Sequence, residues 1–198
     1  MCKMKSMILT QDKVFCPDYD SHSDMLVEMG IKDDKQVPHF VKIEITPPSG
    51  DMRRPPEEWE YSVDQDWLPA WYVREVDEPR CRKSLVDWYG AHVFTEGHHE
   101  VHSGKVWLYG NATATLYGNA TATLCDNATA KLFGNATAEL FGSATATLYG
   151  SATAKLFDSA TATLYGSATA KLYDRSVSIY RADYWARPVV RIAGEVND

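Results

Sequence analysis

The sequence predicts an α+β N-terminal domain followed by a β-solenoid, or β-helix, of octapeptide repeats with two octads in each 16-residue coil. The octad [NS]-A-T-A-[TKE]-L-[YFC]-[GD] recurs without interruption from residue 111 to residue 174, and a short fixed period is typical of solenoids. The residues before the octads combine strand-like and helix-like patterns instead. We therefore predict an acidic α/β domain over residues 1–102, a solenoid over 103–182 and a capping tail over 183–198.

The first domain is expected to begin with a short helix and a strand. The segment SDMLVEMG, residues 23–30, has the capping residue Ser23 at its start and Gly30 at its end, which predicts a helix. In HFVKIEIT, residues 39–46, apolar side chains alternate with polar ones. This alternation predicts a half-buried strand.

A second strand and a second helix follow in this domain. WEYSV, residues 59–63, repeats the alternation after the Pro-rich loop PPSGDMRRPPEE. The stretch 80–89 places Leu85 and Trp88 at helical spacing and is followed by Gly90. A helix that ends at this glycine is therefore expected.

Each octad combines a six-residue strand pattern with a two-residue turn. The fifth position carries charged side chains such as Lys131, Glu139 and Lys155, so this face of the strand must contact water. The two Ala and the Leu on the alternate face therefore point inward. A large side chain can then pack against a small one across a thin core.

A longer period divides the octads into two classes. The last turn residue is Gly in every odd octad, whereas three even octads have Asp126, Asp158 and Asp174 there. One coil therefore contains two octads, and coils stack at about 4.8 Å. This register places Glu139 beside Lys155 as an exposed ion pair. The altered octads at both ends are expected to form the terminal coils.

Aromatic side chains fill the seventh octad position, which lies on the outside if Ala and Leu point inward. They would form two apolar stripes, and exposed apolar patches usually mark interfaces. We predict that the stripes form a homodimer interface, unless the rings stack on one another or the tail covers them. The predicted interface residues are Tyr117, Phe133, Tyr149 and Tyr165 in one stripe and Phe141, Phe157 and Tyr173 in the other.

Threonine pairs of the form Thr-x-Thr repeat along the solenoid and resemble the surfaces of ice-binding solenoids. In the odd octads the array is interrupted by Lys131, and in the even octads Glu139, Lys155 and Lys171 replace one threonine of the pair. Such charges disturb a flat array of hydroxyl groups. Ice binding is therefore an alternative and not the main prediction.

The net charge of −7 is concentrated in the first half of the chain. Residues 1–102 hold 12 Lys and Arg against 20 Asp and Glu, whereas residues 103–198 hold 8 against 7. This balance disfavours direct contact with nucleic-acid phosphates and favours a protein partner with a basic surface. The candidate acidic partner-binding residues are Glu57, Glu58, Glu60, Asp64 and Asp66.

The cysteines and the first residues predict a location in the bacterial host cytosol, that is, a cytoplasmic protein. The four cysteines are irregularly spaced and suggest neither a disulfide framework nor a zinc site. The start, MCKMKSMILTQDK, lacks an apolar run of signal-peptide length. No stretch approaches the roughly 18 apolar residues of a membrane helix, so no membrane contact is expected.

Three segments carry candidate chemistry. DYDSHSD, residues 18–24, resembles the start of a calcium loop but is followed by neither the Gly nor the Glu of an EF-hand, so we interpret it as a loop that caps the next helix. His98, Glu100 and His102 could share a strand face and hold a metal, but no fourth ligand is evident. The two aspartates of VDQDW could act in acid–base chemistry but lack a partnered histidine. We predict no catalytic residue, no metal site and no cofactor.

Four further segments, HSDMLVEMGIKDD, FVKIEITPP, WEYSVDQDWLPAWY and LVDWYGAHV, precede the octads. In this combination the chain resembles a group of uncharacterised hypothetical proteins from gut bacteria and their phages. The resemblance covers nearly the whole chain. It implies an acidic domain joined to an octad solenoid and a mobile-element setting, and it implies no active site.

Together these expectations favour a non-enzymatic protein-binding function. The most concrete version is an inhibitor, carried by a phage or mobile element, that uses its acidic domain to occupy a basic site on a host nucleic-acid-handling defence enzyme; an anti-CRISPR protein is one example. The solenoid would be a rigid scaffold for dimerisation and contact. Two alternatives stay open: a structural or ice-binding Thr-ladder solenoid, and a small metal-dependent enzyme.

Overall fold

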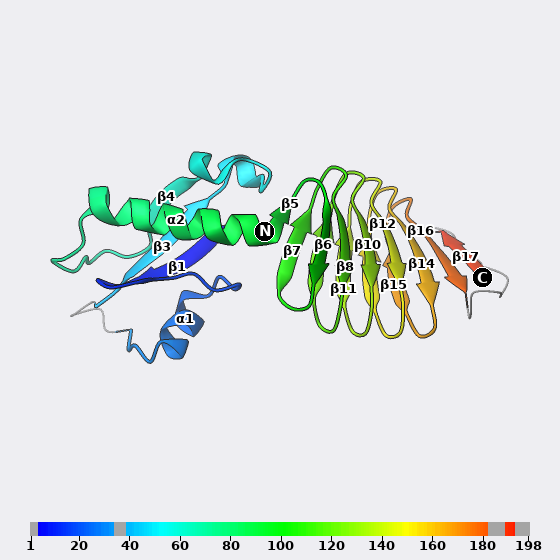
Figure 1. The fold of residues 1–198 in the computed structure, drawn as a ribbon, viewed down its shortest axis with the longest axis horizontal. Helices are drawn as coiled ribbons and strands as arrows, with labels where there is room; N and C mark the ends of the chain where they lie inside the picture. The colour runs from blue at the N-terminus through cyan, green and yellow to red at the C-terminus, as the bar shows by residue number, and fades with distance from the viewer. Residues whose placement is uncertain (1–3, 34–38, 182–188, 193–198) are drawn as a thin grey trace. The chain divides into compact units, whose positions relative to one another are not determined.

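The chain folds into two compact units, Met1–Ala91 and His92–Asp198. A computed structural model describes residues 4–33, 39–181 and 189–192 (Figure 1). The predicted fold class is confirmed, because a small α/β unit is followed by a parallel β-solenoid of about six coils. The boundary between the units falls after residue 91, not after residue 102, because the solenoid sheets already include strands before residue 102.

The N-terminal unit contains one antiparallel sheet with the strand order β2-β1-β3-β4. The two predicted strands are confirmed as β3 and β4, and the Pro-rich loop between them contains two short 3-10 helices. The elements are β1 (Lys5–Leu9), β2 (Val14–Phe15), β3 (Val41–Thr46), η1 (Pro48–Gly50), η2 (Pro56–Glu58) and β4 (Glu60–Val63).

The central strand β1 was not predicted, because it is buried on both faces and shows no alternation. On one face Ile8 packs with Met25 and Leu26 of helix α1 (His22–Glu28). On the other face the ammonium group of Lys5 lies 5.0 Å from the ring centroid of Trp88 in helix α2 (Arg74–His92). The two helices therefore cover opposite faces of the sheet.

Helix α1 begins earlier than the sequence predicted. Its cap is Ser21 and not Ser23, because the Ser21 hydroxyl accepts a hydrogen bond from the Asp24 amide at 3.3 Å. The predicted stop is confirmed: the chain leaves the helix after Glu28, and Gly30 adopts a φ of 67° that suits glycine.

Helix α2 is longer at both ends than the predicted stretch 80–89. It begins at Arg74, where the carboxylate of Asp77 accepts the Val73 amide at 2.9 Å. The same carboxylate accepts a 2.7 Å hydrogen bond from Arg80. The helix continues through Gly90, because a glycine near a helix end costs only about 1 kcal/mol.

The solenoid is built from two parallel sheets that face each other. The six-stranded sheet has the order β15-β13-β11-β9-β7-β5, and the seven-stranded sheet has the order β17-β16-β14-β12-β10-β8-β6. The strands are β5 (Val93–Phe94), β6 (His98–Val101), β7 (Lys105–Leu108), β8 (Thr113–Leu116), β9 (Thr121–Leu124), β10 (Thr129–Leu132), β11 (Thr137–Leu140), β12 (Thr145–Leu148), β13 (Thr153–Leu156), β14 (Thr161–Tyr165), β15 (Thr169–Leu172), β16 (Val177–Arg181) and β17 (Val189–Ile192).

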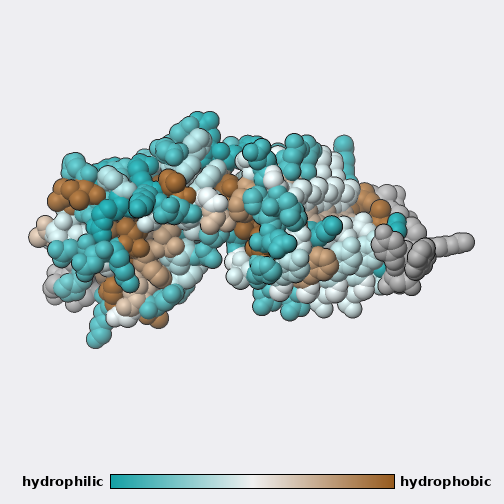
Figure 2. Space-filling model, viewed as in Figure 1, coloured by the Kyte–Doolittle hydropathy of each residue, from teal (hydrophilic) through white to brown (hydrophobic). Residues whose placement is uncertain are grey.

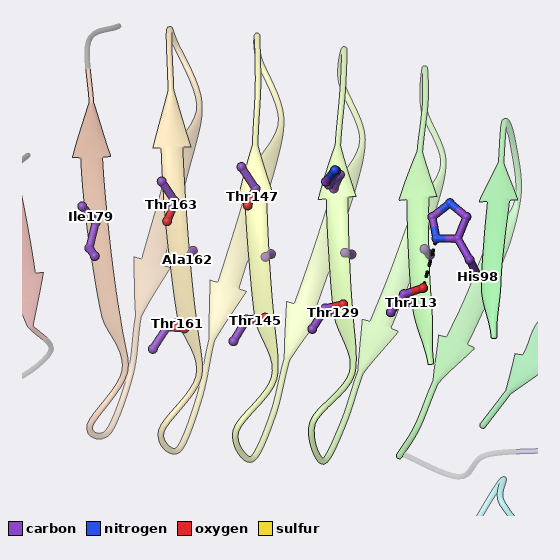
Figure 3. A pocket seen from close by; sticks show the side chains of 13 residues that line it. His98, Thr113, Thr129, Thr145, Thr147, Thr161, Ala162, Thr163 and Ile179 are labelled. Carbon is purple, nitrogen blue, oxygen red and sulfur yellow. Dashed lines mark hydrogen bonds between the residues drawn. The ribbon is translucent and has the colours of Figure 1, made fainter. Parts of the chain in front are cut away.

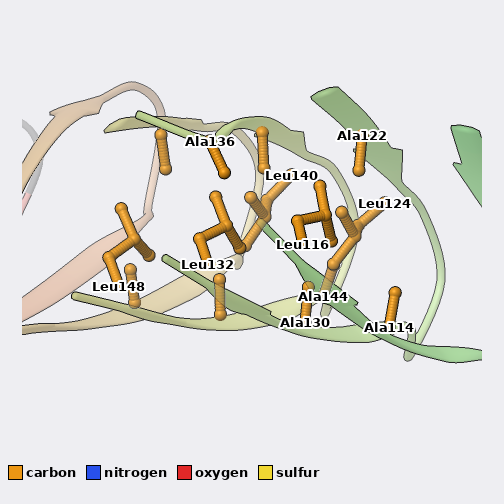
Figure 4. Close-up of a cluster of buried hydrophobic side chains, with 14 of the residues drawn as sticks. Ala114, Leu116, Ala122, Leu124, Ala130, Leu132, Ala136, Leu140, Ala144 and Leu148 are labelled. Carbon is orange, nitrogen blue, oxygen red and sulfur yellow. The ribbon is translucent and has the colours of Figure 1, made fainter. Parts of the chain in front are cut away.

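The predicted coil of two octads is confirmed by the strand register. Thr129 pairs with Thr145, and Glu139 pairs with Lys155, so each residue lies beside the residue one coil further along. The Ala and Leu side chains point inward and fill the space between the sheets (Figure 4). The predicted exposed ion pair is also confirmed, with 2.9 Å between the Lys155 ammonium and the Glu139 carboxylate.

The turns explain why some octads end in Asp. Asp126, Asp158 and Asp174 all adopt positive φ angles, a conformation that glycine adopts at the matching position of other octads. Each carboxylate accepts a backbone amide from the preceding coil, for example Gly142 to Asp158 at 2.9 Å. These carboxylates therefore tie successive turns together along one edge of the solenoid, where Gly142 interrupts the column of aspartates.

The solenoid ends differ from its middle. The first coil contains β5 and β6, whose parallel pairing with β7 and β8 begins the two sheets. At the other end β17 pairs antiparallel with β16 and ends the parallel series. Of the predicted capping tail, residues 183–188 and 193–198 lie outside the described residues.

Candidate functional site

The predicted aromatic stripes exist as two stacks of parallel rings. Consecutive centroids of Tyr117, Phe133, Tyr149 and Tyr165 lie 5.6, 4.7 and 5.0 Å apart. The second stack contains Phe141, Phe157 and Tyr173 at 4.7 Å spacing. Most of these rings are half-buried, and Tyr173 at the end is 42% exposed. Neighbouring rings cover one another's faces, so ring edges contribute much of the apolar surface that is left for a partner.

The outer face of the seven-stranded sheet forms a shallow trough of about 470 Å³. Two rows of threonines line it. One row includes Thr113 and Thr145, and the other includes Thr147 and Thr163 (Figure 3). Lys131 lies in the middle of the second row and is exposed. On the opposite, six-stranded sheet the equivalent row contains the charged residues Glu139, Lys155 and Lys171.

The histidine-rich segment before the octads is used in structural contacts. The ring nitrogens of His98 lie 3.0 Å from the Thr113 hydroxyl and 3.4 Å from the Thr115 hydroxyl. The ring of His102 instead stacks on Tyr117 with 4.9 Å between centroids. These two candidate ligands therefore make different contacts, and the described residues do not group them with Glu100 as a metal cluster.

The polar loop before α1 is structural, as the sequence interpretation proposed. Asp20 pairs with the fully buried Lys5 at 2.6 Å, and Ser21 caps the helix. His22, the first helical residue, faces β3, with its Nε2 3.1 Å from the carbonyl oxygen of Ile43. The loop contributes an ion pair and a helix cap, and only its histidine points toward other candidate ligands.

The five predicted partner-binding carboxylates are all exposed. Two of them have partners within the chain, since Glu58 pairs with Arg54 and Asp64 lies 3.3 Å from His22. The remaining carboxylates, Glu57, Glu60 and Asp66, lie on either side of β4 or within it. The structure therefore leaves an acidic surface near the segment that follows β4.

That segment also carries large exposed hydrophobic side chains that sequence reasoning missed. Half of the exposed large hydrophobics among the described residues lie between residues 67 and 76: Trp67 (72% exposed), Leu68 (47%), Val73 (45%) and Val76 (61%). We call residues 67–76 the exposed segment. Hydrophobic patches interrupt the hydrophilic surface of the N-terminal unit (Figure 2). The sequence signal was the unusual run WLPAWY, which has neither strand nor helix spacing.

The exposed segment is held at both ends by hydrogen bonds. The side chain of Gln65 accepts the Lys42 amide at 2.9 Å and donates to the carbonyl oxygens of Phe40 (3.2 Å) and Trp67 (2.6 Å). At the other end the hydroxyl of Tyr72 lies 3.2 Å from that of Tyr61. The exposed tryptophan is therefore presented by an ordered loop.

The buried thiol of the N-terminal unit, that of Cys81, is poorly suited to nucleophilic chemistry. Burial raises the pKa of Cys81 to about 12, so little thiolate exists near neutral pH. Burial likewise raises the pKa of Cys16 to about 11.

Comparison of the chain with protein-family models, with curated proteins and with solved structures finds no match. Among the described residues, no helix has the length and apolar character needed to span a membrane. The surfaces described above are therefore the basis for a functional proposal.

Proposed function

We propose that this chain is a non-enzymatic protein-binding protein and that the exposed segment is its main contact. The observation that carries the proposal is the 72% exposure of Trp67 beside Leu68 on an ordered loop. Tryptophan is enriched among the residues that dominate binding energy in interfaces. A folded protein gains nothing in stability by exposing so large an apolar side chain.

Charge indicates what kind of partner the segment binds. Asp66 directly precedes the segment and Glu75 lies within it, and both are exposed carboxylates. A complementary partner would combine an apolar pocket for Trp67 with a basic rim. Ordering by Gln65 reduces the entropy that the loop loses on binding.

The specific role that we propose is an inhibitor of a host nucleic-acid-handling defence enzyme in the bacterial cytosol, carried by a phage or mobile element. Such enzymes have basic sites that bind phosphates, and an acidic protein can compete for them. The supporting observations are the excess of acidic residues in the first half and the exposed Glu57, Glu60 and Asp66.

The test is affinity capture from a gut-bacterial lysate with matched variants. We expect a basic protein that the wild type and the control Val86→Ser retain, since Val86 is an exposed apolar residue outside the segment (42%). The double variant Trp67→Ser/Leu68→Ser should bind at least about 30-fold more weakly, as for a residue worth about 2 kcal/mol. Identical captured proteins for the double variant and the wild type would refute the proposal.

The inhibitor role requires a second measurement on the captured protein. Its binding to a labelled oligonucleotide should fall when an equimolar amount of the chain is added, and high salt should relieve this competition. A captured protein that keeps its nucleic-acid binding would contradict the inhibitor role but leave the binding function intact.

For the solenoid we propose a rigid scaffold that also self-associates through an aromatic stack. Identical ladders share one repeat and can pack in register as a two-fold dimer. Replacing Phe141 and Phe157 with Ser should convert a dimer to a monomer in light scattering, with an unchanged circular dichroism spectrum. The rings also stack on one another within one chain and so have a structural role of their own. If the wild type is monomeric at high micromolar concentration, self-association is wrong and stacking is their only role.

A further inference from the structure

Three potential metal ligands from distant parts of the N-terminal unit meet at one place. They are His22 at the start of α1, Glu44 in β3 and Asp64 directly after β4, and their ligand atoms all lie within 4.8 Å of one another. The positions are fixed by the sheet, because Glu44 lies opposite Ser62 and the Asp64 amide donates to the Lys42 carbonyl at 2.9 Å. The group is therefore held by ordered backbone.

The histidine is oriented as a metal ligand would be. Its side chain is only 10% exposed, and its Nε2 lies 3.1 Å from the carbonyl oxygen of Ile43. Because a carbonyl oxygen can only accept, Nε2 must carry the hydrogen. Metal-binding histidines commonly donate their second ring nitrogen to a backbone carbonyl in this way.

The other ring nitrogen, Nδ1, faces a carboxylate. When the imidazole is neutral and its hydrogen is on Nε2, Nδ1 cannot donate a hydrogen bond to this carboxylate. Nδ1 of His22 lies 3.3 Å from Oδ2 of Asp64. In the tautomer with hydrogen on Nε2, both of these atoms are acceptors. Either a second proton on the ring or a cation between the two atoms must make this contact favourable.

The second carboxylate favours the cation. A carboxylate oxygen of Glu44 lies within 4.8 Å of the ligand atoms of both His22 and Asp64, so two carboxylates face the same space. The nearby Lys42 ammonium is directed to Asp33, at 2.8 Å. A single imidazolium would balance only one of the two carboxylates, whereas a divalent ion would balance both.

We propose that His22, Glu44 and Asp64 bind one divalent transition-metal ion. Metal–nitrogen and metal–oxygen bonds of about 2.0–2.2 Å in a tetrahedron separate ligand atoms by roughly 3.3–3.5 Å, which matches the His22–Asp64 distance of 3.3 Å. The Glu44 carboxylate lies within 4.8 Å of the other two ligand atoms, so only a small rotation of its side chain would be needed for coordination. One nitrogen and two oxygen ligands suit Zn²⁺, Mn²⁺, Fe²⁺ or Co²⁺.

Three protein ligands leave a coordination position open for water or for a partner's side chain. This site does not depend on the proposed protein-binding function, because none of its residues belongs to the exposed segment. It does assign Asp64 to a metal and not to the acidic partner surface. Asp66 stays exposed two residues further along.

The test is titration of the EDTA-treated full-length chain with Zn²⁺ by calorimetry and with Co²⁺ by visible absorption. We expect one ion per chain. His22→Gln, Glu44→Gln and Asp64→Asn should each weaken the affinity by more than the roughly 10–100-fold that loss of an outer-sphere partner costs. The controls Asp66→Asn and His98→Gln should bind like the wild type.

A measurement on the wild type makes the test independent of how the variants fold. Addition of Zn²⁺ should shift the ¹⁵N resonance of His22 Nδ1 and leave Nε2 protonated. No saturable binding up to millimolar metal, or equal affinity in His22→Gln, would overturn the proposal. In that case the contact between His22 and Asp64 is an ordinary histidine–carboxylate contact without a metal.

Discussion

The two units fill their cores in different ways. The N-terminal unit buries unique side chains, including Trp59 and Leu85, and both buried charges of the described residues, Lys5 and Asp77. The solenoid buries almost only Ala and Leu, in the same positions of each coil. The stability of the first unit therefore depends on particular contacts, whereas that of the solenoid depends on register and on the number of coils.

The largest effect should come from breaking the register of the solenoid. Deletion of the single residue Ala138 in β11 moves the side chains that follow to the opposite face. We expect a loss of at least about 3 kcal/mol in unfolding free energy, equivalent to a melting temperature roughly 6–12 °C lower. Deletion of the whole coil 127–142 should cost less, because it preserves inward Ala and Leu. Thermal melts by circular dichroism compare the two, and a milder effect of the single deletion would contradict the register argument.

The next effect tests the buried charge of the N-terminal unit against an exposed pair in the solenoid. Asp20→Asn leaves the fully buried Lys5 without its carboxylate partner and should destabilise the unit by about 1–3 kcal/mol. The matched change Glu139→Gln removes an ion pair whose side chains are 46% and 51% exposed. It should cost no more than about 1 kcal/mol. Urea unfolding of both variants would measure the two losses of unfolding free energy. Equal losses would show that burial of Lys5 does not make its ion pair more important for stability than the exposed pair.

A smaller effect separates two roles of the turn aspartates. Asp158→Ala keeps a side chain at a φ of 55° and removes the carboxylate that accepts a hydrogen bond from the Gly142 amide. The free energy of unfolding should therefore fall by about 1–2 kcal/mol. Asp158→Gly removes the same bond but also relieves the backbone strain. It should change stability by less than about 0.5 kcal/mol. If the two variants melt at the same temperature, the positive φ carries no cost.

The smallest expected effect concerns the threonine trough. We expect no thermal hysteresis in ice-growth assays, because the exposed ammonium of Lys131 interrupts the row that contains Thr147 and Thr163. Lys131→Thr removes this interruption and is the matched variant, to be compared with the wild type in the same assay. Shaping of ice crystals by the wild type would favour the ice-binding alternative over a scaffold.

The same contrast explains what could be predicted from the sequence. In the solenoid a repeated pattern encodes the inward face, the coil length and even the Glu139–Lys155 pair. Strand β1 could not be predicted, because burial on both faces removes the alternation and Lys5 resembles a surface residue. The cap of α1 was misplaced by two positions, because Ser21 and Ser23 are equally good capping residues in the sequence.

The candidate sites follow the same rule. The aromatic stripes could be located from their period, but how far stacking covers the rings depends on side-chain orientation. His22, Glu44 and Asp64 come together only through strand pairing and helix packing, so no local pattern joins them. The prediction of no metal site considered each segment separately. Trp67 was overlooked because the run around it matches no regular element.

The pairing of each residue with its counterpart one coil away also has a consequence for inheritance. Tandem copies of a short coding unit readily misalign during replication or recombination, and such events add or remove whole units. In this chain a gain of one octad would keep Ala and Leu in the core but move every following octad to the opposite sheet, whereas a gain of two would leave the following octads in their own sheets. Only the second change preserves the one-coil register in which Lys155 lies beside Glu139 and similar turn residues lie above one another. Lineages of the gene should therefore differ in length mainly by even numbers of octads.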